Sequence, residues 1–100
     1  MLKLTYHNDP SHGWLGISGD LLRAIIAPKK VSEEVSGYSY YHQQSDMFYL
    51  EEDCDATVAL APLREGGYDY EVVDAYSESC FVRRLNQLGR FPAALLDEER

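Results

Sequence analysis

The chain has 100 residues and a net charge of −8, so it forms one small domain, and its acidity disfavours direct binding to nucleic acid or to membrane surfaces. Apolar residues make up 45% of the composition, which is enough for a folded core and argues against disorder. No signal peptide opens the chain, and no apolar run approaches the roughly 20 residues that cross a bilayer. We therefore predict a cytoplasmic protein in which Cys54 and Cys80 are reduced thiols, with one disulfide as the alternative.

Two strand-like segments open the chain and are separated by a loop. Residues 2–7 alternate apolar and polar side chains, which predicts a half-buried strand. Residues 8–13 have the composition of a loop, with Pro10 in a turn. Residues 14–17 then form a short extended piece.

A first helix is expected over residues 21–27, because residues 18–20 (SGD) offer caps in front of it. Its apolar positions 21, 22, 25 and 26 share one face that can pack on a sheet. Pro28 ends this helix, and residues 29–37 form a polar connection that has room for one helical turn over residues 32–35.

Residues 38–51 predict a β-hairpin. Tyrosines enrich the first strand, residues 38–42, and aromatic and apolar residues enrich the second, residues 47–51. Residues 43–46 (QQSD) supply the polar turn between them.

The second strand runs into an acidic junction and then into a helix that starts near residue 56. Asp53 or Asp55 can cap this helix, and acids at its start favour the helix dipole. Pro62 removes a backbone donor, so we expect a kink or a restart there. The two glycines at residues 66–67 end the helix.

The last part of the chain predicts one more strand and one more helix. Residues 68–76 alternate well enough to be a strand, and a helix over residues 80–88 follows, although residues 81–85 can also be interpreted as a strand. Residues 91–100 look like a loosely held tail. The order of elements predicts one α+β domain over residues 1–100, with a mainly antiparallel sheet of three to five strands and two or three helices on one face.

The charge of the chain is uneven. Residues 46–78 hold ten acids and one base, Arg64, so this window has a net charge of −9 and the rest of the chain +1. Such a surface attracts basic protein surfaces, including those that normally hold nucleic acid.

Two stretches carry a resemblance to known proteins. The first is SHGWL at residues 11–15, and the second is YSY at residues 38–40 followed by YLEEDCDA at residues 49–56. Together they resemble a set of short, largely uncharacterised proteins from phages, prophages and plasmids, over residues 6–65. The resemblance implies a mobile-element accessory protein and identifies no functional residues.

The acidic stretch of residues 51–55 has three interpretations. Glu51, Asp53 and Asp55 alternate along an extended segment and could bind Mg²⁺ or Ca²⁺, but the glycine and distal glutamate of an EF-hand are missing. The same acids could form a docking face for a protein. The structural alternative is that an aspartate caps the helix while the glutamates are solvated.

The histidines, cysteines and tyrosines also allow a functional and a structural interpretation. His12 beside Trp14 could contact a ligand or act as a base, or Trp14 could anchor the core while His12 positions the loop. Cys54 or Cys80 could be a nucleophile with His7, His12 or His42, but no spacing supports this and no GxSxG, P-loop, CxxC or HExxH motif is present. The hairpin tyrosines could contact a partner or pack across the strands.

The leading hypothesis is a non-enzymatic inhibitor or adaptor without a cofactor, which binds a basic surface of a host protein. The expected target is a nucleic-acid-binding defence complex, so that the protein acts as an anti-CRISPR or anti-restriction inhibitor by nucleic-acid mimicry. The predicted partner-binding residues are Glu51, Glu52, Asp53, Asp55, Asp69, Glu71, Asp74, Tyr40 and Tyr49. We expect a monomer or homodimer; the alternatives are a metal- or ligand-binding domain or weak enzyme that uses Asp53, Asp55 and His12, and an antitoxin-like partner.

Overall fold

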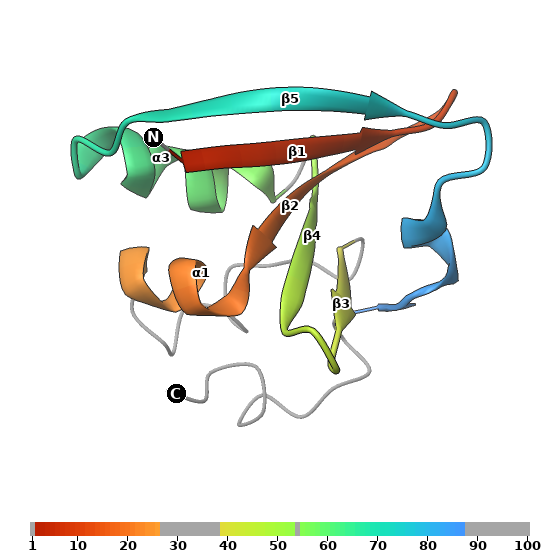
Figure 1. The fold of residues 1–100 in the computed structure, drawn as a ribbon, viewed down its shortest axis with the longest axis horizontal. Coiled ribbons are helices and arrows are strands. Elements are labelled where there is room, and N and C mark those ends of the chain that lie inside the picture. The colour runs from red at the N-terminus through yellow and green to blue at the C-terminus, as the bar shows by residue number, and fades with distance from the viewer. Residues whose placement is uncertain (1, 27–38, 54, 88–100) are drawn as a thin grey trace.

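The computed structural model describes residues 2–26, 39–53 and 55–87, and its elements are shown in Figure 1. The strands are β1 (Leu2–Asn8), β2 (Gly13–Ser18), β3 (Tyr40–His42), β4 (Met47–Glu51), β5 (Tyr70–Tyr76) and the two-residue β6 (Asn86–Gln87). The helices are α1 (Gly19–Ile25), α3 (Ala56–Glu65) and a 3₁₀ helix, η1 (Phe81–Arg84).

The strands form one sheet in the order β5-β1-β2-β4-β3-β6. Four of its pairings are antiparallel, and the pairing of β1 with β5 is parallel. The predicted α+β class and the mainly antiparallel sheet are therefore confirmed. The sheet has six strands when the two-residue β6 is counted. The parallel pair exists because α3 connects β4 to β5 and returns the chain to the far edge of the sheet.

Both α-helices cover the same face of the sheet. The core on this face joins residues of the strands to residues of α1 and α3; its buried members are Leu4, Leu15, Ile17, Leu22, Tyr41, Phe48, Leu50, Ala56, Ala59 and Leu63. Side chains alternate between the two faces of a strand, so Leu15 and Ile17 of β2 point to the helices while Trp14 points away. Helices on one face of the sheet were predicted, and the structure confirms them.

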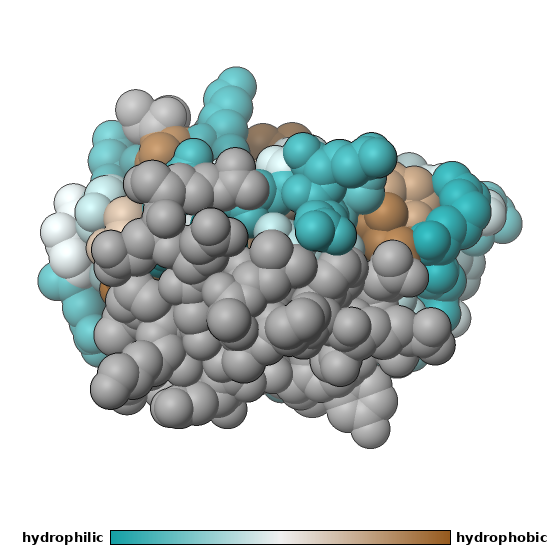
Figure 2. Space-filling model, turned by 90° about the horizontal axis from the view of Figure 1, so that it is seen from below, coloured by the Kyte–Doolittle hydropathy of each residue, from teal (hydrophilic) through white to brown (hydrophobic). Residues whose placement is uncertain are grey.

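The opposite face of the sheet is partly covered by the segment that contains η1. Trp14 and Tyr49 pack there against Cys80 and Val82. Figure 2 views the molecule from below and shows hydrophilic and apolar residues side by side along the margin of the described surface. This second, smaller core packs η1 against β2 and β4, on the face of the sheet opposite α1 and α3.

Ser18 caps α1, as predicted. Its side-chain oxygen accepts a hydrogen bond from the backbone N–H of Leu21 at 3.2 Å, and the helix spans Gly19–Ile25. A Cβ at Gly19 would collide with the carboxylate of Asp46, so the start of α1 requires glycine. The Asp46 backbone lies in the left-handed region, at φ 52°, which aspartate tolerates better than most residues.

The structure corrects two expectations about helices. We expected a kink or a restart at Pro62; α3 continues through Pro62 to Glu65 as one helix, so the restart is wrong. The predicted helix over residues 80–88 is replaced by η1 and β6. Asn86 pairs with Tyr41 and Gln87 with Tyr40, so sheet pairing outweighs the helical pattern there.

Some predictions fall on residues outside those that the structure describes. They are the helical turn over residues 32–35, the reduced state of Cys54 and the tail over residues 91–100. The bounds predicted for two elements were too wide: α1 ends at Ile25, before residue 27, and β3 begins at Tyr40 and not at residue 38. No helix within the described ranges is long and apolar enough to cross a membrane.

Candidate protein-binding surface

The structure divides the predicted acidic residues into buried and exposed groups. Glu51 is 6% exposed and Asp55 is 1% exposed, so neither carboxylate can form part of a docking surface. Glu52, Asp53, Asp69 and Asp74 are exposed, and Glu71 is partly exposed. The expectation that all these acids share one accessible face is therefore wrong for Glu51 and Asp55.

Glu51 is buried because it is the last residue of β4 and lies opposite Trp14 in the ladder. Its carboxylate accepts a hydrogen bond from the backbone N–H of Asp53 at 2.9 Å and lies 3.9 Å from the Nδ1 atom of His12. Glu51 therefore fixes the turn that displays Glu52 and Asp53. Its role is to position the acidic turn.

Asp55 occupies the N-cap position of α3, as one prediction allowed, but its side chain makes no capping hydrogen bond. It accepts a hydrogen bond from the hydroxyl of Ser39 instead. Ser39 is fully buried, and its oxygen also accepts from the backbone N–H of Glu51 at 2.9 Å. Ser39 thus joins the end of β4 to the start of α3.

Three of the exposed acids, Glu52, Asp53 and Asp74, lie near Tyr6 on the helix-bearing side of the sheet. Burial raises the pKa of Tyr6 to about 12, together with the charge of Glu52, a hydrogen bond to Glu52, and the charges of Glu51 and Asp53. Asp74 lies beside Tyr6 in the β1–β5 ladder and accepts a hydrogen bond from Asn8 Nδ2 at 3.3 Å. We call Glu52, Asp53 and Asp74 the acidic cluster.

The other two predicted acids lie apart from the acidic cluster. Glu71 points to the opposite face of the sheet, where its carboxylate lies 3.6 Å from Lys3 Nζ. Asp69 precedes β5, and its carbonyl oxygen accepts a hydrogen bond from Leu2 N at 2.9 Å. The acidic surface therefore extends along β5 on both sides of the sheet.

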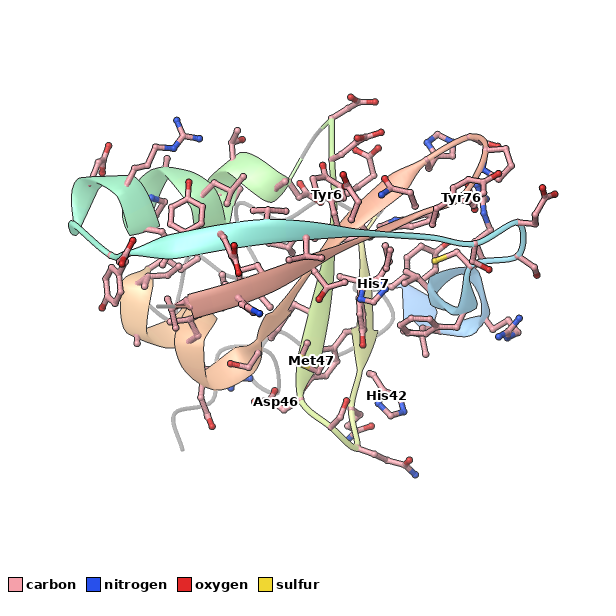
Figure 3. All side chains as sticks on the ribbon, turned by 45° about the horizontal axis from the view of Figure 1, so that its top comes forward. Tyr6, His7, His42, Asp46, Met47 and Tyr76 are labelled. Atoms are coloured by element: carbon pink, nitrogen blue, oxygen red, sulfur yellow. The ribbon has the colours of Figure 1, made fainter. Side chains whose placement is uncertain are left out.

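Of the two tyrosines predicted to face a partner, Tyr49 is buried and Tyr40 is partly exposed. Tyr40 is opposite Tyr49 across the hairpin, and Tyr40 also packs edge-on against Trp14 at a ring-centroid distance of 5.9 Å. Tyr49 is only 8% exposed, so cross-strand packing is the correct interpretation for it. Tyr76, at the end of β5, is 63% exposed and Tyr68 is 44% exposed. Figure 3 shows Tyr76 and Tyr6 on the same side of the sheet, with His7 and Met47 on the other.

The residues proposed for metal binding do not form a metal site in the described part of the chain. Residues 2–26, 39–53 and 55–87 contain no group of three or more histidine, cysteine, aspartate or glutamate side chains arranged to hold a metal ion. Trp14 is a core anchor, as one interpretation held, and His12 is exposed. Cys80 is a buried free thiol.

Two ion pairs were not predicted from the sequence. Arg23 forms a buried pair with Asp46, and Arg83 forms hydrogen bonds with the carboxylate of Asp9. Asp9 also accepts hydrogen bonds from the N–H groups of Ser11 and His12, both at 2.9 Å. The sequence of residues 9–12, Asp-Pro-Ser-His, is typical of such an Asx turn, so this turn could have been predicted. The ion pairs themselves could not. Arg23 and Arg83 are each neutralised by an acid outside the acidic cluster. Neither arginine therefore neutralises the charge of the acidic cluster.

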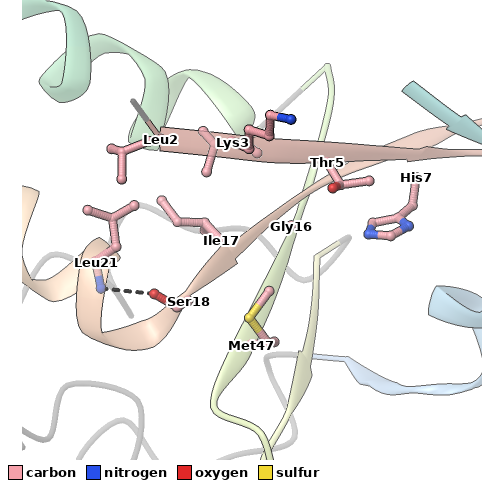
Figure 4. A pocket seen from close by; sticks show the side chains of 10 residues that line it. Leu2, Lys3, Thr5, His7, Gly16, Ile17, Ser18, Leu21 and Met47 are labelled. Carbon is pink, nitrogen blue, oxygen red and sulfur yellow. Dashed lines mark hydrogen bonds between the residues drawn. The ribbon is translucent and has the colours of Figure 1, made fainter. Parts of the chain in front are cut away.

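A pocket of about 340 Å³ lies between β1, the end of β2 and the start of α1 (Figure 4). Lys3, Thr5 and His7 of β1 line it together with Leu21 of α1 and Met47 of β4. Burial lowers the pKa of His7, which favours the neutral form of its imidazole. The pocket lacks a convergent set of charged groups among these residues.

Comparison of the chain with protein-family models, with curated proteins and with solved structures gave no match.

Proposed function

We propose that the protein is a non-enzymatic inhibitor or adaptor that binds a basic surface of another protein through the acidic cluster and the neighbouring side of β5. The observation that carries this proposal is the gathering of Glu52, Asp53 and Asp74 around Tyr6. Carboxylates that share one region create a negative potential, and this potential steers a basic partner to it and raises the association rate.

The pairing of the protein's own cations supports the same proposal. Lys3, Arg23 and Arg83 each pair with an acid that lies outside the acidic cluster. These internal pairs leave the charge of the acidic cluster available to a partner. An acidic surface of this kind repels phosphate groups, so the partner is a protein.

The specific partner that we propose is a nucleic-acid-binding defence complex of a host cell, such as a CRISPR effector or a restriction enzyme. The likeness of the sequence to short proteins from mobile elements supports this choice. The protein would act in the cytoplasm by occupying the basic cleft that otherwise holds nucleic acid. Carboxylates in that cleft would block substrate entry both sterically and electrostatically.

Displacement of DNA from purified defence complexes tests this function. The variant Glu52→Lys with Asp53→Lys reverses two exposed charges of the acidic cluster. The matched control, Asp20→Lys with Glu65→Lys, makes the same change in net charge at the exposed start of α1 and end of α3. We expect the first variant to lose at least about tenfold in inhibition and the control to lose much less. Equal inhibition by both variants would refute the proposal.

A further inference from the structure

The strand β5 forms an open edge of the sheet. It pairs with β1 on one side, and no other strand of residues 2–26, 39–53 and 55–87 pairs with it on the other (Figure 1). Edge strands of soluble proteins are usually blunted by proline, lysine, a bulge or a covering element. Tyr70–Tyr76 contains no proline and no lysine, and its register with β1 runs unbroken over seven residues.

The hydrogen bonds to β1 show which backbone groups of β5 face outwards. Leu2 N donates to the carbonyl of Asp69 at 2.9 Å, and Ser77 N donates to the carbonyl of Asn8 at 2.8 Å. In a parallel ladder, alternate residues of a strand bond to the same neighbour. The odd-numbered residues of β5 therefore bond to β1. The even-numbered residues direct their N–H and C=O groups to the open edge; they are Tyr70, Val72, Asp74 and Tyr76.

The side chains along this edge are apolar and acidic. Val72 is 39% exposed, Val73 46% and Tyr76 63%, which are high values for large apolar residues in a strand. Glu71 and Asp74 lie three residues apart and point to opposite faces of the sheet, with Asp74 in the acidic cluster. An incoming strand would therefore meet one carboxylate on each face and valines between them.

We propose that an extended basic segment of the partner adds to β5 as a further strand of the sheet, an inference that rests on the proposed function. Its main chain would pair with the outward groups of the even-numbered residues. Basic residues three apart would lie opposite Glu71 and Asp74, and apolar residues would lie opposite Val72 and Val73.

Charge complementarity favours a basic segment over a second copy of this chain. Pairing of two β5 strands would bring four carboxylates into one ladder, in a protein that already carries a net charge of −8. A basic strand instead places a cation opposite Asp74, close to the rest of the acidic cluster, and a second cation beside Glu71, where it competes with Lys3 for the carboxylate. Electrostatic attraction then adds to the main-chain hydrogen bonds.

A synthetic peptide tests the pairing directly. The probe is a capped peptide with two lysines three positions apart, valines between them and threonines at its ends. Its control is the same peptide with N-methyl groups on alternate residues, which removes the donors of the pairing edge. Titration into ¹⁵N-labelled protein should shift the amide resonances of Tyr70, Val72, Asp74 and Tyr76 and slow their hydrogen exchange. Equal shifts with the N-methylated peptide, or none with either, would overturn the proposal. So would shifts of these amides that depend on protein concentration alone, which would indicate a second copy.

A proline at position 72 separates strand addition from simple charge attraction. Val72→Pro removes an outward N–H and leaves the hydrogen bonds to β1 intact, whereas the control Val72→Thr retains the donor. We expect Val72→Pro to lower the affinity for both the peptide and a defence complex at least about tenfold, and Val72→Thr to change it little. If Val72→Pro binds the complex normally while Glu52→Lys with Asp53→Lys does not, strand addition is wrong and the acidic docking stands. If neither variant changes binding, both proposals fail.

Discussion

Arg23 and Asp46 form a bidentate ion pair with nitrogen–oxygen distances of 2.9 and 3.1 Å. Their side chains are only 6% and 7% exposed, so the pair is buried. Tyr41 donates a further hydrogen bond to the same carboxylate at 2.6 Å. The backbone N–H of Gly19 donates to the Asp46 carbonyl at 2.7 Å. Asp46, in the turn between β3 and β4, therefore holds the start of α1 against this turn through its bonds to Arg23 and Gly19.

Removal of the Asp46 carboxylate should destabilise the fold severely. Asp46→Ala leaves Arg23 and Tyr41 in a buried site without their shared acceptor, and breaking one partner of a buried pair costs about 3–5 kcal/mol. Urea unfolding followed by circular dichroism measures this loss in the free energy of unfolding. The control Asp20→Ala, at an exposed position of α1, should change it by less than about 1 kcal/mol. A similar loss in both variants would show that the pair has no special role.

The pair between Asp9 and Arg83 should make stability depend on pH in the acid range. Hydrogen bonds from Arg83, and then from the backbone of His12 and Ser11, hold the pKa of Asp9 well below its usual value, against the opposing effect of burial. A lowered pKa contributes stability that is present above the unfolded value of about 3.9 and is lost as pH falls through the folded value. Arg83→Gln should raise the pKa of Asp9 in an NMR titration and flatten the acid limb of the stability curve. An unchanged pKa in this variant would contradict the assignment.

Tyr6 offers a test of the acidic cluster in the absence of any partner. Its pKa is raised to about 12, first by burial and then by Glu52. The raised value contributes stability that is present below the unfolded pKa of about 10 and is lost as pH rises towards the folded value. Glu52→Gln should lower the Tyr6 pKa without restoring it to 10, because burial remains; Glu65→Gln should leave it unchanged. A tyrosinate titration by NMR distinguishes these outcomes.

Ser39 should be important for stability although it carries no charge. Ser39→Ala removes the hydroxyl that joins the buried Asp55 carboxylate to the N–H of Glu51. Loss of hydrogen bonds to buried polar groups costs about 1–3 kcal/mol. Thermal unfolding should show a lower melting temperature for Ser39→Ala, and Thr57→Ala, on the exposed side of α3, should leave it nearly unchanged. An unaltered melting temperature in Ser39→Ala would show that the hydroxyl is replaceable.

Local patterns in the sequence predicted most of the elements and the fold class. Alternation predicted β1 and β5, aromatic and apolar enrichment around a polar turn predicted the hairpin of β3 and β4, and Ser18 was correctly placed among the caps of α1. The parallel pairing of β1 with β5 could not be predicted this way, because it joins segments about 68 positions apart and depends on where α3 returns the chain. Helical periodicity gave a wrong prediction for residues 80–88, where η1 and β6 form instead. The pairing of β6 with β3 has no signal in the local pattern.

The candidate site was harder to predict, since exposure depends on packing across the sheet. Glu51 and Glu52 are adjacent acids, but Glu51 ends β4 opposite Trp14, whereas Glu52 lies in the turn that follows the strand and is exposed. Asp55 is buried, and its carboxylate accepts a hydrogen bond from the hydroxyl of Ser39, which is distant in sequence. Asp74 joins the acidic cluster only through the β1–β5 register. The placements of Asp55 and Asp74 depend on segments distant in sequence and have no local signal.

The salt dependence of binding tests the central claim most directly. The dissociation constant of the wild-type protein from a defence complex that it inhibits is measured between about 50 and 200 mM salt, beside Glu52→Lys with Asp53→Lys and its matched control. Docking through the acidic cluster predicts an affinity that weakens at least about tenfold over this range for wild type and control, and a weaker, flatter dependence for the reversed variant. An affinity that is insensitive to salt and equal in all three proteins would contradict the account.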